Sequence, residues 1–219
     1  MPDYAGQVFF VAKLAAGLLA IVDPLGVIPQ FIALTENRPS SEIRSISLTT
    51  TIAVILTLFL SSVCGERILT LFGISLPSFR TAGGILILLI AVYMFHAEPT
   101  LTKYRPEETR EALTKSGIAV VPMAIPFLAG PGAITAVILY AHQCTTWGQW
   151  GILWAIILFV GLVVYLSLRL AEPIKNKIGQ IGVNIISRLM GLILAAIAVE
   201  FITKGLAEIF PGWVSHGAR

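Results

Sequence analysis

Two interrupted apolar segments contain the residues whose types and spacing suggest chemistry. Asp23-Pro24-Leu25-Gly26 lies within the apolar stretch 7–34, and Gly130-Pro131-Gly132 lies within the apolar stretch 118–140. Proline removes a backbone donor and glycine accepts angles that other residues avoid, so both motifs predict a broken helix. Groups freed at such a break are tolerated at membrane depth only when they are buried or line a cavity. The two motifs therefore predict either packing kinks or a binding site lined by main-chain groups.

Asp23 is one of only two aspartates in the chain. A carboxylate at membrane depth is costly unless it is paired or protonated, so Asp23 would bind an ammonium group, a cation or a proton. Its structural alternative is to cap the free N–H groups that follow Pro24, and the two roles are compatible. A half-helix that begins at a break also points partial positive charge into it, which favours a carboxylate ligand. The candidate substrate-binding residues are Asp23, Pro24, Gly26, Gly130, Pro131, Gly132 and Thr135.

The composition is that of an integral membrane protein. Hydrophobic residues make up 56% of the 219 positions and charged residues only 12%, against roughly 25% charged in soluble domains. From residue 116 to residue 168 there are 53 positions without a charged side chain, enough for two crossings of about 20 residues each. This composition excludes a disordered chain, a nucleic-acid-binding module and nearly every soluble enzyme.

The apolar segments predict an all-α, polytopic protein with six transmembrane helices. No segment shows the alternation that a transmembrane barrel requires. The longest hydrophilic stretch, residues 96–117, divides the chain into a first half at 1–95 and a second half at 118–219. The expected crossings are about 7–34, 45–65, 81–95, 118–140, 150–168 and 186–202.

The two halves show an internal repeat. The register that places Pro24 on Pro131 also aligns residues 84–92 with residues 191–199. Because each half has an odd number of crossings, the second copy would enter the membrane upside down, as in many secondary transporters. The sequence thus predicts two inverted three-helix repeats with broken first and fourth helices. The alternative is a chance similarity between apolar helices.

The basic residues predict the orientation. Ten of the fifteen Lys and Arg residues fall on the face that contains the linker 96–117. The positive-inside rule places that face in the cytoplasm and both termini outside the cytoplasmic membrane.

Other charged and reactive residues have simpler interpretations. Glu200 is expected to pair with Lys204 one turn later, and Arg80 and Arg188 to reach polar groups at helix ends. Cys64 and Cys144 are expected to be free thiols. Metalloprotease, serine-hydrolase and P-loop motifs are absent from the sequence, so we assign no catalytic residue, no metal site and no cofactor beyond a coupling ion, Na⁺ or H⁺.

Three motifs support a family resemblance: FGISLPSFRTAGG at 72–84, PFLAGPGAI at 126–134 and ISRLMG at 186–191. In this order they resemble the MarC family, a UPF0056-type family of bacterial and archaeal membrane proteins, over nearly the whole chain. The SnatA-type branch of that family implies a transporter of small neutral amino acids such as glycine and alanine. It also implies inverted repeats and a substrate held at the broken helices, at the motif positions Asp23, Pro24, Gly26 and 130–132.

The sequence and the resemblance together favour a secondary transporter of small neutral amino acids in the inner membrane. Its expected partners are the solute and the lipid bilayer, with no nucleic acid; a homo-oligomer and a monomer both stay open. Two other functions also stay open: a channel, facilitator or exporter of another small solute, and a non-transporting membrane assembly protein. A channel would show no saturable or gradient-dependent uptake, and an assembly protein would show no flux.

Overall fold

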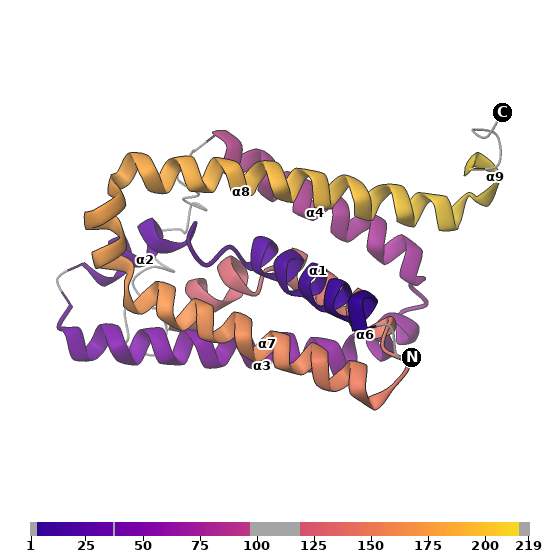
Figure 1. Cartoon of the computed structure of the whole chain (residues 1–219), viewed down its shortest axis with the longest axis horizontal. Helices are drawn as coiled ribbons and strands as arrows, with labels where there is room; N and C mark the ends of the chain where they lie inside the picture. The colour runs from indigo at the N-terminus through magenta and orange to yellow at the C-terminus, as the bar shows by residue number, and fades with distance from the viewer. Residues whose placement is uncertain (1–3, 37, 97–118, 215–219) are drawn as a thin grey trace.

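The computed structural model describes residues 4–36, 38–96 and 119–214 of the chain (Figure 1). Every regular element within these ranges is a helix, which confirms the predicted all-α class. The linker from 97 to 117 lies outside the described residues. The elements are α1 (Tyr4–Val22), α2 (Ile28–Thr35), α3 (Ser40–Leu71), α4 (Leu76–His96), the π-helix η1 (Ala119–Leu128), α6 (Pro131–His142), α7 (Trp147–Arg169), α8 (Ala171–Ile209) and α9 (Pro211–Val214).

Four helices of the described chain are long and apolar enough to cross a membrane. They are α3, α4, α7 and the part of α8 from Asn184 to Ile209, with mean hydropathy between 1.8 and 2.5. Their outward faces carry exposed large apolar side chains such as Leu48, Ile52 and Leu162, which suits contact with lipid tails. The protein is thus a multi-helix integral membrane protein, as its composition predicts.

The two remaining apolar segments are each divided into two helices. Residues 7–34 form most of α1, a break and most of α2, whereas residues 119–140 form η1, a break and most of α6. Pro122 and Pro126 lie inside η1 and cannot donate main-chain hydrogen bonds. The wider π spacing accommodates them, and the N–H of Ala129 donates to the carbonyl of Ala124 at 2.8 Å, five residues earlier.

Several helices extend beyond the apolar segments that predicted them. The third crossing begins at Leu76, before the expected 81, and the last helix covers 171–209 where 186–202 was expected. Hydropathy marks the part of a helix that lies in hydrocarbon, whereas hydrogen bonding continues into polar residues such as Lys175. Gly179, with φ 73° and ψ 168°, places a bend inside α8.

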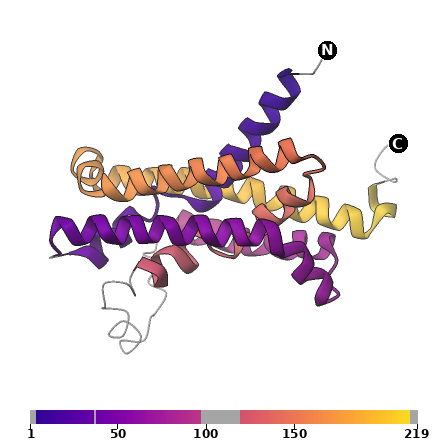
Figure 2. The same cartoon turned by 90° about the horizontal axis from the view of Figure 1, so that it is seen from below.

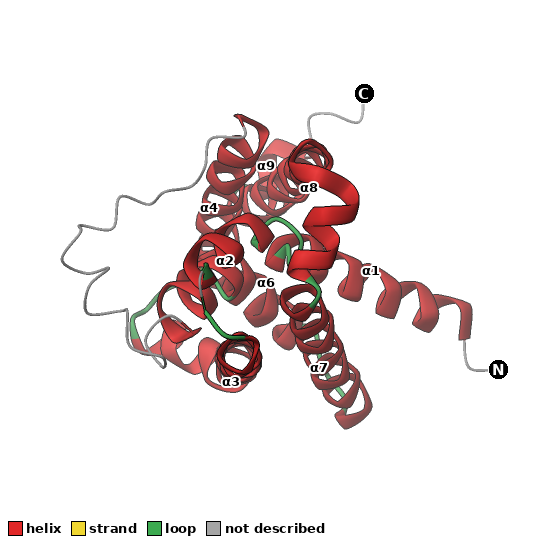
Figure 3. Cartoon of the chain, turned by 90° about the vertical axis from the view of Figure 1, so that its left-hand side faces the viewer, coloured by secondary structure: helices red, strands yellow, loops and turns green. Residues whose placement is uncertain are grey.

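The helices pack in antiparallel pairs around a central helix (Figures 1 and 3). α4 packs against α8, and α3 packs against α7. The short helix α6 lies between these pairs and contacts α1, α3, α4 and α7. The N-terminal half of α1 projects beyond the other helices (Figure 2), whereas Leu14, Leu18 and Ile21 in its later turns are buried in the shared core.

Two glycines bring α4 and α8 into backbone contact. A Cβ atom added at Gly84 would lie 2.9 Å from the carbonyl oxygen of Ala198, and one added at Gly191 would lie 3.1 Å from that of Ala91. Such distances leave no room for a side chain, so both positions require glycine for this packing. Gly83 allows a similar approach on the next face, because its added Cβ would lie 2.0 Å from Cγ2 of Thr135 in α6.

Candidate substrate site at two helix breaks

The first break is organised around Asp23. Its φ of 42° is in the left-handed region, which Asp and Asn adopt more readily than other non-glycine residues. The N–H of Asp23 closes α1 by donating to the carbonyl of Leu19 at 2.9 Å, and the N–H of Gly26 donates to Oδ1 of Asp23 at 3.2 Å. The capping role considered from the sequence is therefore present in the geometry.

Gly26 leaves the space that the Asp23 carboxylate occupies. A Cβ atom added at Gly26 would lie only 1.8 Å from Oδ2 of Asp23, so any other residue would displace the carboxylate. Gln30 lies on the other side of this break, in α2. Oriented to donate, its amide nitrogen lies 2.9 Å from the Gly26 carbonyl and 3.2 Å from that of Val27. Gly26 thus contacts the Asp23 carboxylate through its N–H and the Gln30 amide through its carbonyl. Pro24, the residue after Asp23, is buried.

The second break leads into the first turn of α6, whose first residue, Pro131, is exposed. Gly130 is the N-cap, with an extended conformation, and it provides no side-chain cap. Gly132 and Ala133 in the first turn are buried. The first N–H groups of a helix have no partner within the helix, and their dipoles point outward from its start. The start of α6 can therefore donate hydrogen bonds to an anionic group such as a carboxylate.

Thr135 has a more local role than a polar lining residue. It is 2% exposed, and its hydroxyl donates to the carbonyl of Pro131 at 2.8 Å. Its methyl group lies against Gly83 of α4. Thr135 therefore helps to fix the start of α6 against α4.

The two breaks lie close to each other inside the molecule. A Cβ atom added at Gly132 would lie 3.4 Å from Cγ2 of Ile21, two residues before Asp23 in the chain. The same atom would lie 2.8 Å from Cγ1 of Ile87 in the middle of α4. Gly132 of the second half thus lies against the end of α1, two residues before Asp23, and against the middle of α4.

A separate group of charged residues lies nearer the end of the molecule where α1 begins and α8 ends. Lys204 Nζ pairs with Oε1 of Glu200 at 2.7 Å, which confirms the pair expected from their spacing. Arg80 pairs with Glu208 and does not merely reach out of its helix end. Arg80 and Glu208 are 128 positions apart in the sequence, which explains why no local sequence pattern indicated this pair.

Metal chemistry has no support in the part of the chain that the structure describes. Within 4–36, 38–96 and 119–214 no three His, Cys, Asp or Glu residues gather as metal ligands would. Cys64 and Cys144 are both free thiols, as expected.

Comparison with known proteins gives a consistent family. The family model described as MarC family integral membrane protein matches residues 8–210. The chain is 39% identical to the Escherichia coli membrane protein YhcE over 91% of this chain and 93% of that protein. It is 38% identical to a Buchnera aphidicola membrane protein over 91% of this chain and 93% of that protein. It is 39% identical to a Methanocaldococcus jannaschii membrane protein over 87% of this chain and 93% of that protein.

These relatives are named as membrane proteins without a stated substrate. No solved structure matches the chain. Together with the matched motifs and the apolar helices, the comparisons establish that this chain belongs to the MarC family of integral membrane proteins.

Proposed function

We propose that this protein is a secondary transporter of small neutral amino acids, of the glycine and alanine class, across the cytoplasmic membrane. The observation that carries the proposal is the meeting of two helix breaks. Gly132, in the uncapped first turn of α6, lies beside Ile21, which precedes Asp23 by two residues. The start of α6 offers main-chain donors and the neighbouring end of α1 leads into a carboxylate, which is the combination that a zwitterion requires.

In this proposal each end of the amino acid has a defined partner. The substrate carboxylate accepts hydrogen bonds from the first N–H groups of α6, and the ammonium group binds Asp23. The side chains of Ile21 and Ile87 crowd Gly132, which favours a substrate with a small side chain. A coupling ion, Na⁺ or H⁺, would supply the driving force.

The packing supports an inverted repeat as the basis of alternating access. Gly84 approaches the backbone at Ala198, and Gly191, its equivalent in the register that places Pro24 on Pro131, approaches the backbone at Ala91. Ala91 and Ala198 are also equivalent in this register. α4 and α8 run antiparallel (Figure 1). A rotation that places the first half on the second therefore reverses the direction in which its helices run. We infer that the two halves rock against each other and open the breaks to each side in turn.

The element order favours one orientation. α1 begins, and α8 ends, at the same end of the molecule as the α3–α4 and α6–α7 connections (Figure 1). With the positive-inside rule, this end faces outward and the end bearing Arg38 and Arg169 faces the cytoplasm.

Flux into proteoliposomes tests the proposal. Purified protein in liposomes should take up labelled glycine and alanine with saturation kinetics, and an imposed Na⁺ or H⁺ gradient should raise the uptake. Empty liposomes and liposomes with the Asp23→Ala variant serve as controls. Uptake that neither saturates nor responds to either gradient would instead indicate a channel, and the absence of all flux would overturn the proposal.

A further inference from the structure

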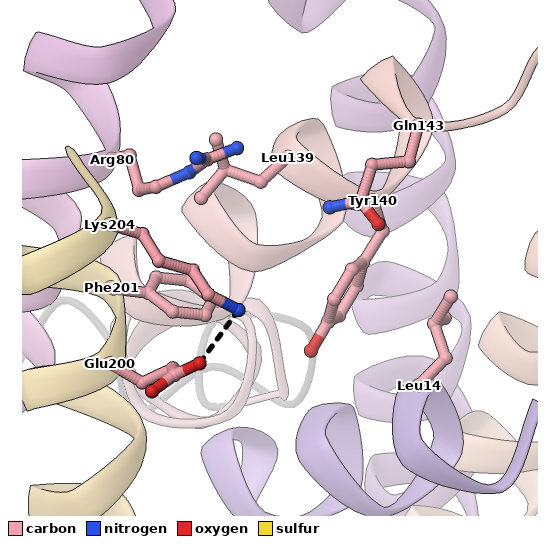
Figure 4. A pocket seen from close by; sticks show the side chains of 8 residues that line it. All are labelled: Leu14, Arg80, Leu139, Tyr140, Gln143, Glu200, Phe201 and Lys204. Carbon is pink, nitrogen blue, oxygen red and sulfur yellow. Dashed lines mark ion pairs between the residues drawn. The ribbon is translucent and has the colours of Figure 1, made fainter. Parts of the chain in front are cut away.

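A second polar site lies between the helix breaks and the outward end. A pocket of about 400 Å³ is lined by four helices, a size within the roughly 300–1,000 Å³ typical of small-molecule sites. Figure 4 shows its side chains converging on one space. The lining residues are Leu14 from α1, Arg80 from α4, Leu139 and Tyr140 from α6, Gln143 just after α6, and Glu200, Phe201 and Lys204 from α8.

The charges of this pocket lie within the apolar span of α8. Glu200 precedes the end of that helix at Ile209 by about two and a half turns, or roughly 14 Å at 1.5 Å per residue. A charged side chain that faced lipid at this depth would be costly, so such residues face a protein interior or a water-filled space. Glu200 and Lys204 pair with each other and line the pocket, and with 55% and 53% of their side chains exposed they fit a water-filled space and not a closed interior.

The internal repeat does not require these charges. The register that aligns the two halves places Glu200 on Tyr93 and Lys204 on Ala97, and neither of these can carry a compensating charge at neutral pH. The acid and the base therefore belong to one face of the protein only. A feature that the packing of both halves would need should occur in both of them.

We propose that this pocket is an outer binding site for one small zwitterionic amino acid, which it holds before the amino acid moves to the helix breaks. This inference rests on the proposed transport function for its direction of movement. Lys204 binds the substrate carboxylate and Glu200 binds the ammonium group, so the amino acid replaces the pair that these two residues make with each other. Arg80, which stays paired with Glu208, adds positive charge beside the carboxylate. Leu14, Leu139 and Phe201 provide the apolar wall for a short side chain.

The helix that leads inward from the pocket is α6. Leu139 lies eight residues after Pro131, which corresponds to about 12 Å along the helix axis. Tyr140 lies at the inner side of the route toward α1, where a Cβ atom added at Gly17 would be 2.7 Å from the Tyr140 hydroxyl oxygen. The tyrosine hydroxyl therefore closes the pocket against α1 at Gly17, about one turn beyond Leu14, and its movement would open the way toward Asp23.

Protection from labelling tests this site without requiring transport. Gln143→Cys is introduced in a Cys64→Ser, Cys144→Ser background, and a membrane-impermeant maleimide is added with or without alanine. Alanine should slow the labelling, whereas propionate and ethylamine, each lacking one charged group, should protect only at much higher concentrations. Absence of protection by alanine at saturating concentration would overturn the proposal.

The charged residues are tested by the same readout. Glu200→Gln and Lys204→Met should each raise the half-protecting alanine concentration by about 10- to 100-fold, the effect of losing one charge-assisted hydrogen bond. Glu42→Gln is the matched control, because it removes the similarly spaced Arg38–Glu42 pair at the opposite end of the molecule. Unchanged protection in both pocket variants would show that Glu200 and Lys204 only pair with each other, and would overturn the proposal.

Two further comparisons separate this site from the helix breaks. Alanine should still protect the Asp23→Ala variant, because the pocket binds independently of the breaks. Loss of protection in this variant would show that the protecting alanine binds at the breaks, and would overturn the outer site.

Uptake is measured on the same preparations. Uptake without protection would overturn the outer site alone, whereas protection without uptake would support the outer site and overturn the proposed transport.

Discussion

Gly84 and Gly191 make equivalent contacts on opposite sides of the interface between α4 and α8. Each lies against the backbone of the other helix, Gly84 at Ala198 and Ile202 and Gly191 at Ala91 and Phe95. All of these positions correspond in pairs when the two halves of the sequence are aligned. The contact between the two helices is thus reciprocal, and it depends on the absence of a side chain at both glycines.

Alanine substitutions at these glycines test the interface. Gly84→Ala and Gly191→Ala should each lower the free energy of unfolding by about 1–3 kcal/mol, because the added methyl group meets backbone atoms that cannot easily move. Gly84→Ala should be the more damaging, since its contact distance of 2.9 Å is the shorter of the two. Thermal unfolding in detergent, followed by tryptophan fluorescence, measures the effect.

The matched control is Gly151 of α7, where an added Cβ would meet no atom within 4 Å. Gly151→Ala should stabilise the protein by about 0.4–1 kcal/mol through the lower entropy of the unfolded chain. Equal unfolding temperatures for Gly84→Ala and Gly151→Ala would contradict the packing described above.

Substitutions of Asp23 separate its conformational role from its charge. Asp23→Asn keeps a residue that tolerates the left-handed φ and a side-chain oxygen that can accept from Gly26, so its stability should match that of the wild type. Its half-saturating substrate concentration should rise by about 10- to 100-fold if Asp23 binds the ammonium group. Asp23→Ala should lose roughly 0.5–2 kcal/mol from the cap and also lose transport. Transport kinetics for Asp23→Asn equal to those of the wild type would show that Asp23 is only a cap.

Gly26 provides an independent test of the same carboxylate. Gly26→Ala should displace the side chain of Asp23, because the new methyl group would occupy the position of its Oδ2 atom. Its effect on the half-saturating concentration should therefore resemble that of Asp23→Asn. The double variant Asp23→Asn, Gly26→Ala should be no worse than the more damaging single variant, because both changes remove one interaction. Additive losses in this double-mutant cycle would mean that Gly26 acts through another group.

Cys144, in the connection between α6 and α7, gives a pH-dependent signal. Burial raises the pKa of the Cys144 thiol above its ordinary value, and the thiol donates to the carbonyl of Tyr140 at 3.4 Å. Because the thiolate is the reacting form, Cys144 should react with maleimide more slowly than a free thiol at neutral pH, and its rate should level off at a higher pH. The measurement uses the Cys64→Ser variant, with N-acetylcysteine as the reference. A rate profile that coincides with that of the reference would contradict the burial of this thiol.

The local features of this fold were predictable from the sequence, whereas the long-range contacts were not. Pro24 and Pro131 act on their own main chain, so the positions of the breaks follow from residue type. The pairing of Glu200 with Lys204 is likewise fixed by helical spacing. The pairing of Arg80 with Glu208 depends on how α4 packs against α8, and the four-helix pocket has no pattern along the chain. The π-helical form of residues 119–128 could not be predicted from apolar periodicity either. Prolines indicate that a helix is interrupted, but they do not specify which helical form the backbone takes.

Counterflow in proteoliposomes tests the central claim most directly, since a carrier that alternates between two sides must exchange substrate. Vesicles loaded with unlabelled alanine are diluted into medium with a trace of labelled alanine, in the absence of any ion gradient. Alternating access at the helix breaks predicts a transient accumulation of label above equilibrium for the wild type and none for Asp23→Ala. Equal accumulation in both proteins, or a wild type that equilibrates label without an overshoot, would contradict alternating access at the helix breaks.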